Sequence, residues 1–184
     1  MSKVAIAGNA SGTGTFTIAA PNSNTDRTLT LPDEAGTVLT SASDIRSQAL
    51  NGPAFSAYAY GTTAISAGTR TKITFDNEVF DTNNNFASSR FTPTVAGYYQ
   101  INLSFQDTGT STILQAELYK NGSPYATGGY VGNAALFYIA AVSTIVYMNG
   151  TTDYLEGYCY SSATNTVGSS SASNFFNGAL VRAA

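Results

Sequence analysis

Residues 91–105, FTPTVAGYYQINLSF, constrain the fold more than any other part of the chain. The stretch opens with turn-forming residues up to Gly97, and apolar and polar side chains then alternate. A two-residue period is typical of a strand with one face buried and the other facing solvent. We therefore predict a half-buried strand whose buried side chains are Tyr99, Ile101, Leu103 and Phe105.

The composition of the whole chain favours strands over helices. Only 10% of the 184 residues are charged, whereas roughly 25% is usual in globular proteins. The 12 Tyr and 10 Phe suit strands, and the abundant Ser, Thr, Asn and Gly favour turns. An apolar fraction of 43% is enough for a core. These features predict an all-β protein.

From residue 54 onward, apolar runs alternate with turn sequences at the spacing of a sandwich or barrel. The clearest turn is Lys120-Asn121-Gly122, because Asn-Gly is a strong hairpin signature. The number of runs predicts an antiparallel jelly-roll sandwich of roughly eight to ten strands. The expected strands cover residues 55–60, 71–75, 97–105, 113–119, 136–148, 154–160 and 175–181.

Residues 136–148, LFYIAAVSTIVYM, are apolar on both faces of the expected strand. A strand of a two-layer sandwich normally buries only one face. A neighbouring subunit is the simplest cover for the second face, and Phe137 and Tyr138 belong to this predicted contact. The alternative is a long strand in the centre of a large core.

Residues 1–44 contain three short alternating segments, 15–18, 28–31 and 37–40. A piece of about 40 residues usually needs a disulfide, a metal or oligomerisation to fold, and this one has no Cys or His. We predict a β-structured trimerisation and attachment segment at 1–44, a neck at 45–53 and a head at 54–184; the alternative is an unstructured tail. The side chains expected to interlock three chains are Phe16, Ile18, Leu29, Leu31, Val38 and Leu39.

Residues 54–184 resemble the globular head of complement component 1q and its tumour-necrosis-factor-like relatives. Phe91, Gly97 and Tyr99 match the signature strand, whereas Ile101 and Leu103 replace its usual aromatic residues. The resemblance implies a homotrimeric jelly roll that binds other molecules and catalyses nothing. It also rests on upstream and C-terminal positions, namely Phe80, Asp81, Phe86, Phe176, Gly178 and Leu180.

A second resemblance covers about residues 13–40. The sequence GTFTIAAPNSNTDRTLTLPDEAGTVLT is similar to a short segment that recurs in tail fibres and other appendage proteins of tailed bacteriophages. In that family the segment belongs to an attachment or shaft region. It implies that the N-terminus docks on other virion proteins.

The sequence argues against enzymatic chemistry. With no His, Ser-His-Asp and Cys-His arrangements and His-based zinc sites are excluded. Cys159 is the single cysteine, so we expect a small buried apolar residue without a disulfide. Asp76, Glu78 and Asp81 are the closest acidic cluster but are too few for calcium. We therefore expect no catalytic residues, no cofactor and no metal.

The remaining composition bears on partners. The eight Lys and Arg are scattered, which argues against nucleic acid. The longest apolar run, 134–142, is too short to span a membrane. Residues 107–111, 125–133 and 161–173 have the composition of recognition loops, although they could equally be plain connections. Within them or beside them, Tyr130 and Tyr160 are the candidates for receptor contact.

Together these observations predict a homotrimeric bacteriophage virion protein made in the host cytoplasm. Its N-terminus would dock on the particle as part of a tail fibre or appendage, and its head would bind a host surface glycan or protein. A capsid head fibre or decoration protein without receptor binding is one alternative. A bacterial adhesin or matrix protein is another.

Overall fold

The computed structural model describes residues 11–15, 17, 19, 22–26, 28, 52–107, 112–131 and 138–184. The chain divides into two compact units, Met1–Val38 and Leu39–Ala184, and every strand described below belongs to the second. The three short strands expected in 1–44 fall largely outside the described residues, and so does most of the neck. The same holds for the predicted contact residues Phe16, Ile18, Leu29, Leu31, Val38, Leu39 and Phe137.

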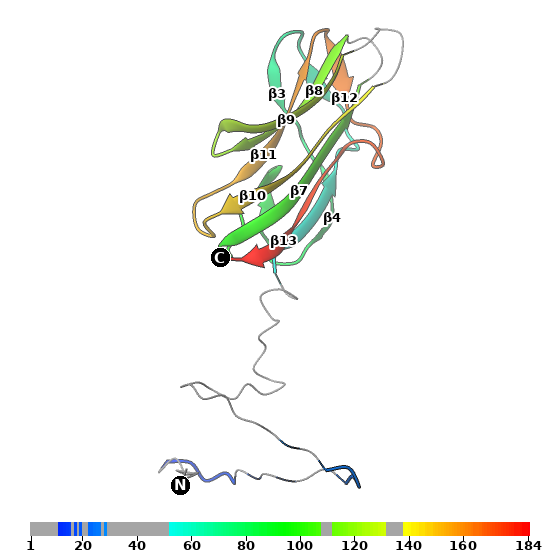
Figure 1. Ribbon diagram of the computed structural model, residues 1–184. Coiled ribbons are helices and arrows are strands. Elements are labelled where there is room, and N and C mark those ends of the chain that lie inside the picture. The colour runs from blue at the N-terminus through cyan, green and yellow to red at the C-terminus, as the bar shows by residue number, and fades with distance from the viewer. Residues whose placement is uncertain are drawn as a thin grey trace. The chain divides into compact units, whose positions relative to one another are not determined.

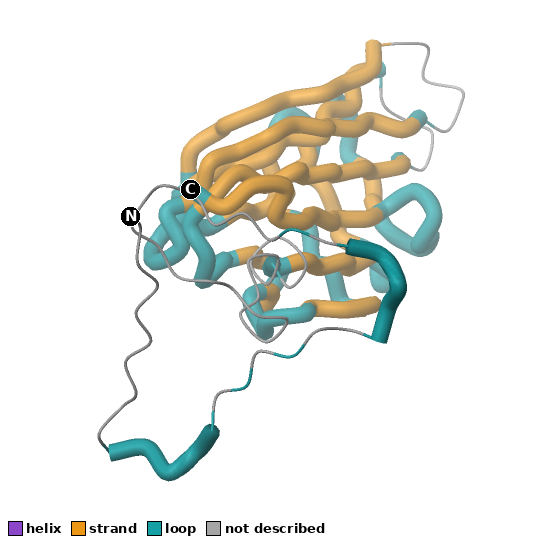
Figure 2. The backbone as a smooth tube through the Cα atoms, turned by 60° about the horizontal axis from the view of Figure 1, so that its bottom comes forward, coloured by secondary structure: helices purple, strands orange, loops and turns teal. Residues whose placement is uncertain are grey.

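The second unit is an all-β antiparallel jelly-roll sandwich, as the sequence predicts. Two main sheets pack against each other (Figure 1), and no helix occurs in the described part of the chain (Figure 2). Accordingly, this part contains no helix long and apolar enough to cross a membrane. The first sheet has the order β10-β7-β13-β1-β4. Its strands are β10 (Ile139–Met148), β7 (Gly97–Gln106), β13 (Phe175–Ala183), β1 (Ala54–Tyr58) and β4 (Asn77–Asp81).

The second sheet has the order β5-β6-β11-β8-β9, with β3 also pairing with β11. A separate two-stranded ribbon joins β12 to β2. The strands of the second sheet are β5 (Phe86–Ala87), β6 (Arg90–Phe91), β11 (Leu155–Ser161), β8 (Ile113–Lys120), β9 (Ser123–Val131) and β3 (Arg70–Lys72). The ribbon strands are β12 (Asn165–Val167) and β2 (Thr63–Ile65).

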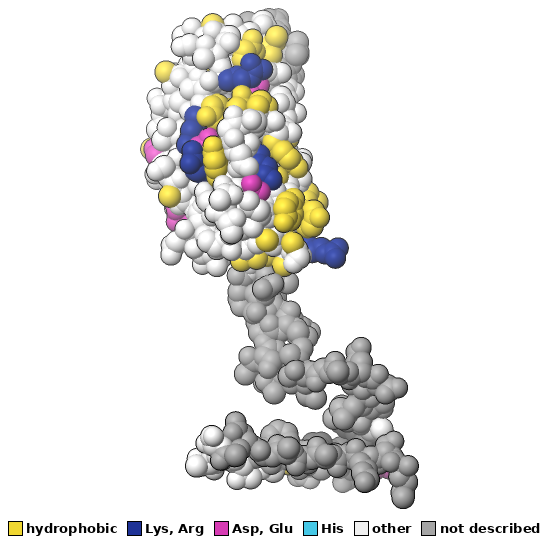
Figure 3. Space-filling model, turned by 90° about the vertical axis from the view of Figure 1, so that its left-hand side faces the viewer, with side chains coloured by type: hydrophobic (Ala, Val, Ile, Leu, Met, Phe, Trp, Pro, Cys, Tyr) yellow, Lys and Arg dark blue, Asp and Glu magenta, His cyan; other side chains and the backbone are white. Residues whose placement is uncertain are grey.

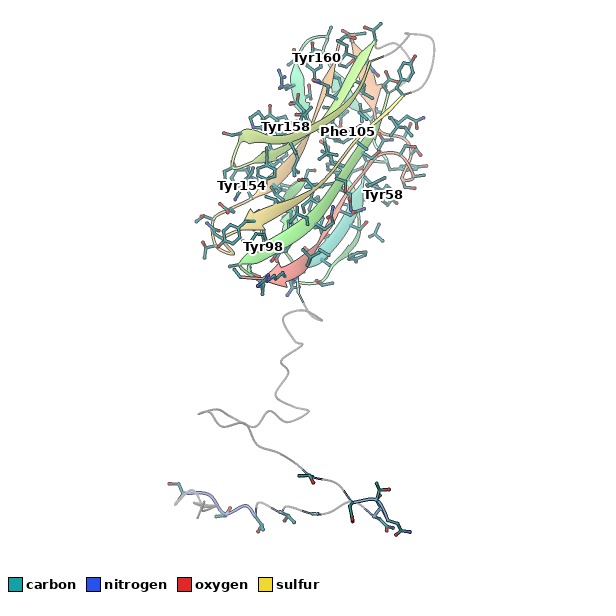
Figure 4. The ribbon with its side chains drawn as sticks, viewed as in Figure 1. Tyr58, Tyr98, Phe105, Tyr154, Tyr158 and Tyr160 are labelled. Atoms are coloured by element: carbon teal, nitrogen blue, oxygen red, sulfur yellow. The ribbon has the colours of Figure 1, made fainter. Side chains whose placement is uncertain are left out.

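Strand β7 runs through the middle of the first sheet, paired with β10 on one side and β13 on the other. Its alternating side chains Tyr99, Ile101, Leu103 and Phe105 are all fully buried between the sheets. This confirms the predicted strand and its buried face. Figure 4 shows Phe105 in the interior of the sandwich.

A cluster of aromatic rings fills the core beside β7. Phe91 stacks on Phe55 with 4.2 Å between ring centroids, and Phe176 meets Phe55 edge-on at 4.9 Å. Such pairs contribute about 0.5–1.5 kcal/mol beyond the area they bury. Gly178 must be a glycine here because a Cβ would collide with Ile101 and with the carbonyl of Gln100.

Expectations about three segments need correction. Residues 125–133 were expected to form a recognition loop, but Ser123–Val131 is strand β9, paired along its length with β8. Residues 161–173 also contain strand β12. The predicted strand 136–148 begins at Ile139 in the described residues, and its side chains alternate between buried and exposed.

Candidate interaction surfaces

The outer face of the first sheet carries exposed apolar side chains. Because alternate residues of a strand point to opposite faces, the residues between the buried ones of β7 and β10 face outward. Tyr98 and Tyr147 lie opposite each other in the pairing, with ring centroids 5.5 Å apart. These two rings, Ile145 and Val181 are between 43% and 55% exposed. We call these four residues the outer apolar patch.

The outer apolar patch borders a depression of about 610 Å³ beside the end of β13. Its remaining lining comes from the last three residues, 182–184. The chain end is fixed there, since the amide of Ala184 donates to the carbonyl of Ala96 at 3.0 Å. Figure 4 places Tyr98 at this end of the sheet, close to the C-terminus marked in Figure 1.

A row of polar side chains crosses the same face. Asn102 Nδ2 donates to Asn177 Oδ1 at 3.0 Å, and Ser143 Oγ donates to Asn102 Oδ1 at 2.8 Å. Gln100 Nε2 in turn donates to Ser143 Oγ at 3.0 Å. Exposed Val79 and Phe80 lie on the edge strand β4 of this sheet. The face therefore combines apolar groups with a self-paired polar row, which is the composition of a protein–protein interface.

The outer face of the second sheet has a different chemistry. Carboxylates lie close to the sheet, and cationic side chains cover them. The side chain of Glu117 is 2% exposed beneath Arg70, which is 52% exposed, with 2.9 Å between charged atoms. Glu156 is 4% exposed beneath both Lys72 and Arg90, at 2.8 and 2.9 Å. In Figure 3 the Lys and Arg side chains form separate groups on the surface, with acidic and hydrophobic side chains beside them.

Two carboxylates of the head, Glu156 and Asp153, have a lowered pKa. Burial alone would raise the pKa of Glu156, but hydrogen bonds and charges from Lys72 and Arg90 outweigh it and lower the pKa below its usual range. At Asp153 burial also opposes ionisation. Hydrogen bonds from Asn121 and Lys120 overcome it and lower the pKa. Both groups are therefore charged at neutral pH.

Tyrosine rings lie between the cations on this face. Tyr119 stacks on Tyr158 with centroids 4.0 Å apart. Arg90 lies 3.9 Å above the ring of Tyr154, and Arg70 lies 5.3 Å from the ring of Tyr160. Such contacts between a cation and a ring hold the charged groups against the sheet. The three labelled tyrosines of this group, Tyr154, Tyr158 and Tyr160, appear on the side of β11 in Figure 4.

The described residues offer little for catalysis or metal binding. Burial raises the pKa of the Cys159 thiol to about 12, so it is not a nucleophile at neutral pH. The carboxylate of Asp76 accepts the amides of Tyr60 and Gly61 at 2.7 and 2.8 Å, and that of Asp81 accepts the amide of Phe86 at 2.6 Å. Among these residues no group of three or more His, Cys, Asp or Glu could hold a metal ion.

The head residues proposed from the sequence as trimer or core positions lie inside one chain. Each one described is buried, so these residues hold the sandwich together and leave the outer faces to others. Their part in a trimer stays a prediction. They are Phe91, Gly97, Tyr99, Ile101, Leu103, Phe105, Tyr138, Phe176, Gly178 and Leu180.

The two candidates for receptor contact, Tyr160 and Tyr130, both belong to strands of the second sheet. Tyr160 is half-buried on the outer face of the second sheet, beneath Arg70. Tyr130 belongs to strand β9 rather than to a loop, and its side chain is outside the description. Residues 136–148 were expected to meet a neighbouring subunit with their second face, and this stretch contains Ile145 and Tyr147 of the outer apolar patch. Tyr98 and Val181 were not predicted, although the alternation in β7 that buries Tyr99 also exposes Tyr98.

Comparison with known proteins supports the fold. The sequence matches no protein-family model and no curated protein. The structure is similar to the globular domain of zebrafish complement 1qA protein, with a TM-score of 0.57 and 16% identity over 72% of this chain and 98% of that one. It is also similar to murine APRIL, with a TM-score of 0.58 and 7% identity over 70% and 98%.

A third similar structure is the phage PRD1 vertex protein P5. It has a TM-score of 0.51 and 15% identity over 71% of this chain and 97% of that one. These likenesses confirm the resemblance inferred from the signature strand. The head of this chain has the jelly-roll fold of complement component 1q and tumour-necrosis-factor-like proteins.

Proposed function

We propose that the protein is a non-enzymatic, homotrimeric structural component of a bacteriophage virion. Its N-terminal segment attaches to other virion proteins, and its jelly-roll head is displayed on the outside of the particle. The outer apolar patch is the main observation that supports a trimer. Tyr98, Ile145, Tyr147 and Val181 form a cluster on one sheet face of a single chain, and such clusters mark interaction sites.

The similarity of the head to trimeric families and to a phage vertex protein supports the same assembly. So does the likeness of residues 13–40 to phage appendage segments. Around a threefold axis, the patch of each copy would pack against a neighbour and lose its contact with water. The second sheet, with its charged and tyrosine-rich outer face, would then be available to a host surface glycan or protein.

Three measurements test this proposal. Light scattering should give a mass near three times the 19.1 kDa of one chain. Antibodies against the head should bind intact virions at a defined position. The isolated protein, carrying a fluorescent tag, should bind host cells saturably. A stable monomer would contradict the trimer, and unlabelled particles would contradict the virion location.

One alternative keeps the same trimer. If the antibodies label the capsid and the isolated protein binds no host cells, the protein is a head fibre or decoration protein. The polar row on the first sheet is compatible with a receptor-binding fibre and with a decoration protein, because it would take part only in the contact between subunits. Cell binding is therefore the measurement that separates the two.

A further inference from the structure

A polar cavity of about 470 Å³ lies on the head away from the outer apolar patch. It is formed by the end of β3, the hairpin of β5 and β6, and the residues just after β6. Its lining side chains include Asn84, Ser88, Thr92 and Thr94 together with two cations, Lys72 and Arg90. Amides and hydroxyls both donate and accept hydrogen bonds, so this lining suits a ligand rich in hydroxyl groups.

The charge at the cavity is positive. Lys72 and Arg90 share one carboxylate, Glu156, whose side chain is 4% exposed. Two positive charges and one negative charge leave an excess of one positive charge at the surface. Lys72 uses two of its three donors on Glu156 and on the Ser88 carbonyl. Arg90 contacts Glu156 through two of its three nitrogens, so both cations retain N–H groups for an anionic partner.

The cavity is held in shape by its own hydrogen bonds. Buried Asn85 accepts the amide of Thr94 at 3.2 Å, and its carbonyl accepts the amide of Thr92 at 2.7 Å. Ser88 and Ser89 have positive φ at the tip of the hairpin, a conformation that costs energy outside glycine. The buried Ser89 hydroxyl fixes this tip by accepting the amide of Phe75 at 2.9 Å. A site with fixed groups loses little entropy on binding.

Tyrosine rings stand next to the two cations. Arg90 lies over the ring of Tyr154 at 3.9 Å, and Lys72 is paired with Tyr158 across the strands. Tyrosine offers a rigid apolar face with a polar tip, which suits the mixed surface of a sugar ring. These rings do not line the cavity themselves, but they neighbour the two cations that do.

We propose that this cavity binds an acidic saccharide. The carboxylate or phosphate of the sugar bonds to Lys72 and Arg90, and its hydroxyls bond to the amide and hydroxyl side chains of the lining. This inference rests on the proposed function, because it names the chemical class of the host surface receptor. It also places recognition at the β5–β6 hairpin and the turns beside it, whereas the sequence alone pointed to the segments 107–111, 125–133 and 161–173.

The test is calorimetric titration of the full chain with three probes. These are an oligogalacturonate that carries carboxylates, a phosphorylated maltohexaose that carries phosphates, and neutral maltohexaose. We expect at least one acidic probe to bind and maltohexaose not to bind. Arg90→Gln and Lys72→Gln should each weaken acidic binding by about tenfold or more, as expected for a lost charge-assisted hydrogen bond.

Arg70→Gln is the matched control, because Arg70 is also paired with a buried carboxylate on this face but does not line the cavity. It should leave acidic binding unchanged. If a single variant fails to fold, the double variant Arg90→Gln, Glu156→Gln removes the pair without leaving a buried carboxylate partly unpaired. Absence of binding by both acidic probes would overturn the proposal. Equal loss in Arg70→Gln, or equal binding of maltohexaose, would do the same.

A competition experiment, in which host-cell binding is measured with an excess of each acidic probe, separates this inference from the function on which it rests. Mass and virion labelling do not depend on the cavity. A trimer that labels virions and binds host cells, but whose cell binding is not reduced by an excess of either acidic probe, keeps its proposed function and loses only the saccharide site.

Discussion

At the scale of single residues, Tyr98 and Tyr99 give the sharpest contrast in the molecule. They are neighbours in sequence but face opposite sides of β7. Tyr99 is fully buried, and its hydroxyl donates to the Val95 carbonyl at 2.7 Å, whereas Tyr98 is 45% exposed in the outer apolar patch. Substitutions at the two positions therefore separate folding from assembly.

We predict that Tyr99→Asp prevents folding, because a buried unpaired charge costs several kcal/mol. Tyr99→Phe should lower the free energy of unfolding by only about 1 kcal/mol, because it removes a single hydrogen bond. Tyr98→Asp should leave the fold intact and weaken the trimer. Circular dichroism and light scattering on the three variants measure these effects. An unfolded Tyr98→Asp protein would show that this side chain supports the core.

The thiol of Cys159 allows a second prediction at this scale. The side chain is fully buried, and burial raises its pKa to about 12. At pH 8 the reactive thiolate is therefore almost absent. We expect no reaction of the native protein with a colorimetric thiol reagent, and reaction of one thiol per chain after denaturation. Rapid modification of the native protein would mean that β11 opens readily.

At the scale of elements, the sequence predicted a strand well where buried apolar residues alternate with exposed polar ones. The alternation in β7 and the Asn-Gly turn after β8 are local patterns, and both appear in the structure; Asn121 and Gly122 have the positive φ that a tight hairpin turn requires. Strand β9 was missed because Gly128 and Gly129 are typical of loops. The need for Gly128 arises from β10, which is distant in sequence.

A Cβ at position 128 would collide with the Ala141 carbonyl of β10. We therefore predict that Gly128→Ala destabilises the fold by about 1–3 kcal/mol, as overpacking usually does. Thr127→Ala, at an exposed neighbouring position of the same strand, should have little effect. Chemical denaturation of the two variants compares them. Equal stability would mean that β9 and β10 can separate at no cost.

The ion pairs around β11 make stability depend on pH. Because the folded pKa of Glu156 is lowered from its ordinary value of 4.5, its stabilisation is present above pH 4.5 and is lost as the pH falls through the lowered value. Asp153, lowered from 3.8, behaves in the same way at lower pH. We expect melting temperatures to fall below pH 4.5, and to fall less steeply in Glu156→Gln. An unchanged slope in that variant would assign the acid sensitivity to other groups.

At the scale of the whole molecule, the sequence predicted the sandwich and, through residues 136–148, one strand of the surface proposed to hold three copies together, but it did not predict Tyr98 or Val181. It left Tyr99, Ile101 and their partners as either trimer or core positions, because an alternating strand shows only that its two faces differ. Which face meets the opposing sheet and which meets a neighbour depends on how the sheets pack. That packing is set by residues far apart in the chain, such as Phe55 and Phe91.

The outer apolar patch leads to the last prediction. Ile145 and Val181 are 54% and 55% exposed in one chain, so their replacement by Glu costs the monomer little. In a trimer the same charges would be removed from water without a partner, which is costly. We therefore expect the double variant Ile145→Glu, Val181→Glu to keep the circular dichroism of the wild type while its light-scattering mass falls from three chains to one. Thr127→Glu, exposed on the second sheet, should remain a trimer. A double variant that stays trimeric would place the subunit contact on another face, with the Val79 and Phe80 edge of β4 as the next surface to test by the same substitutions.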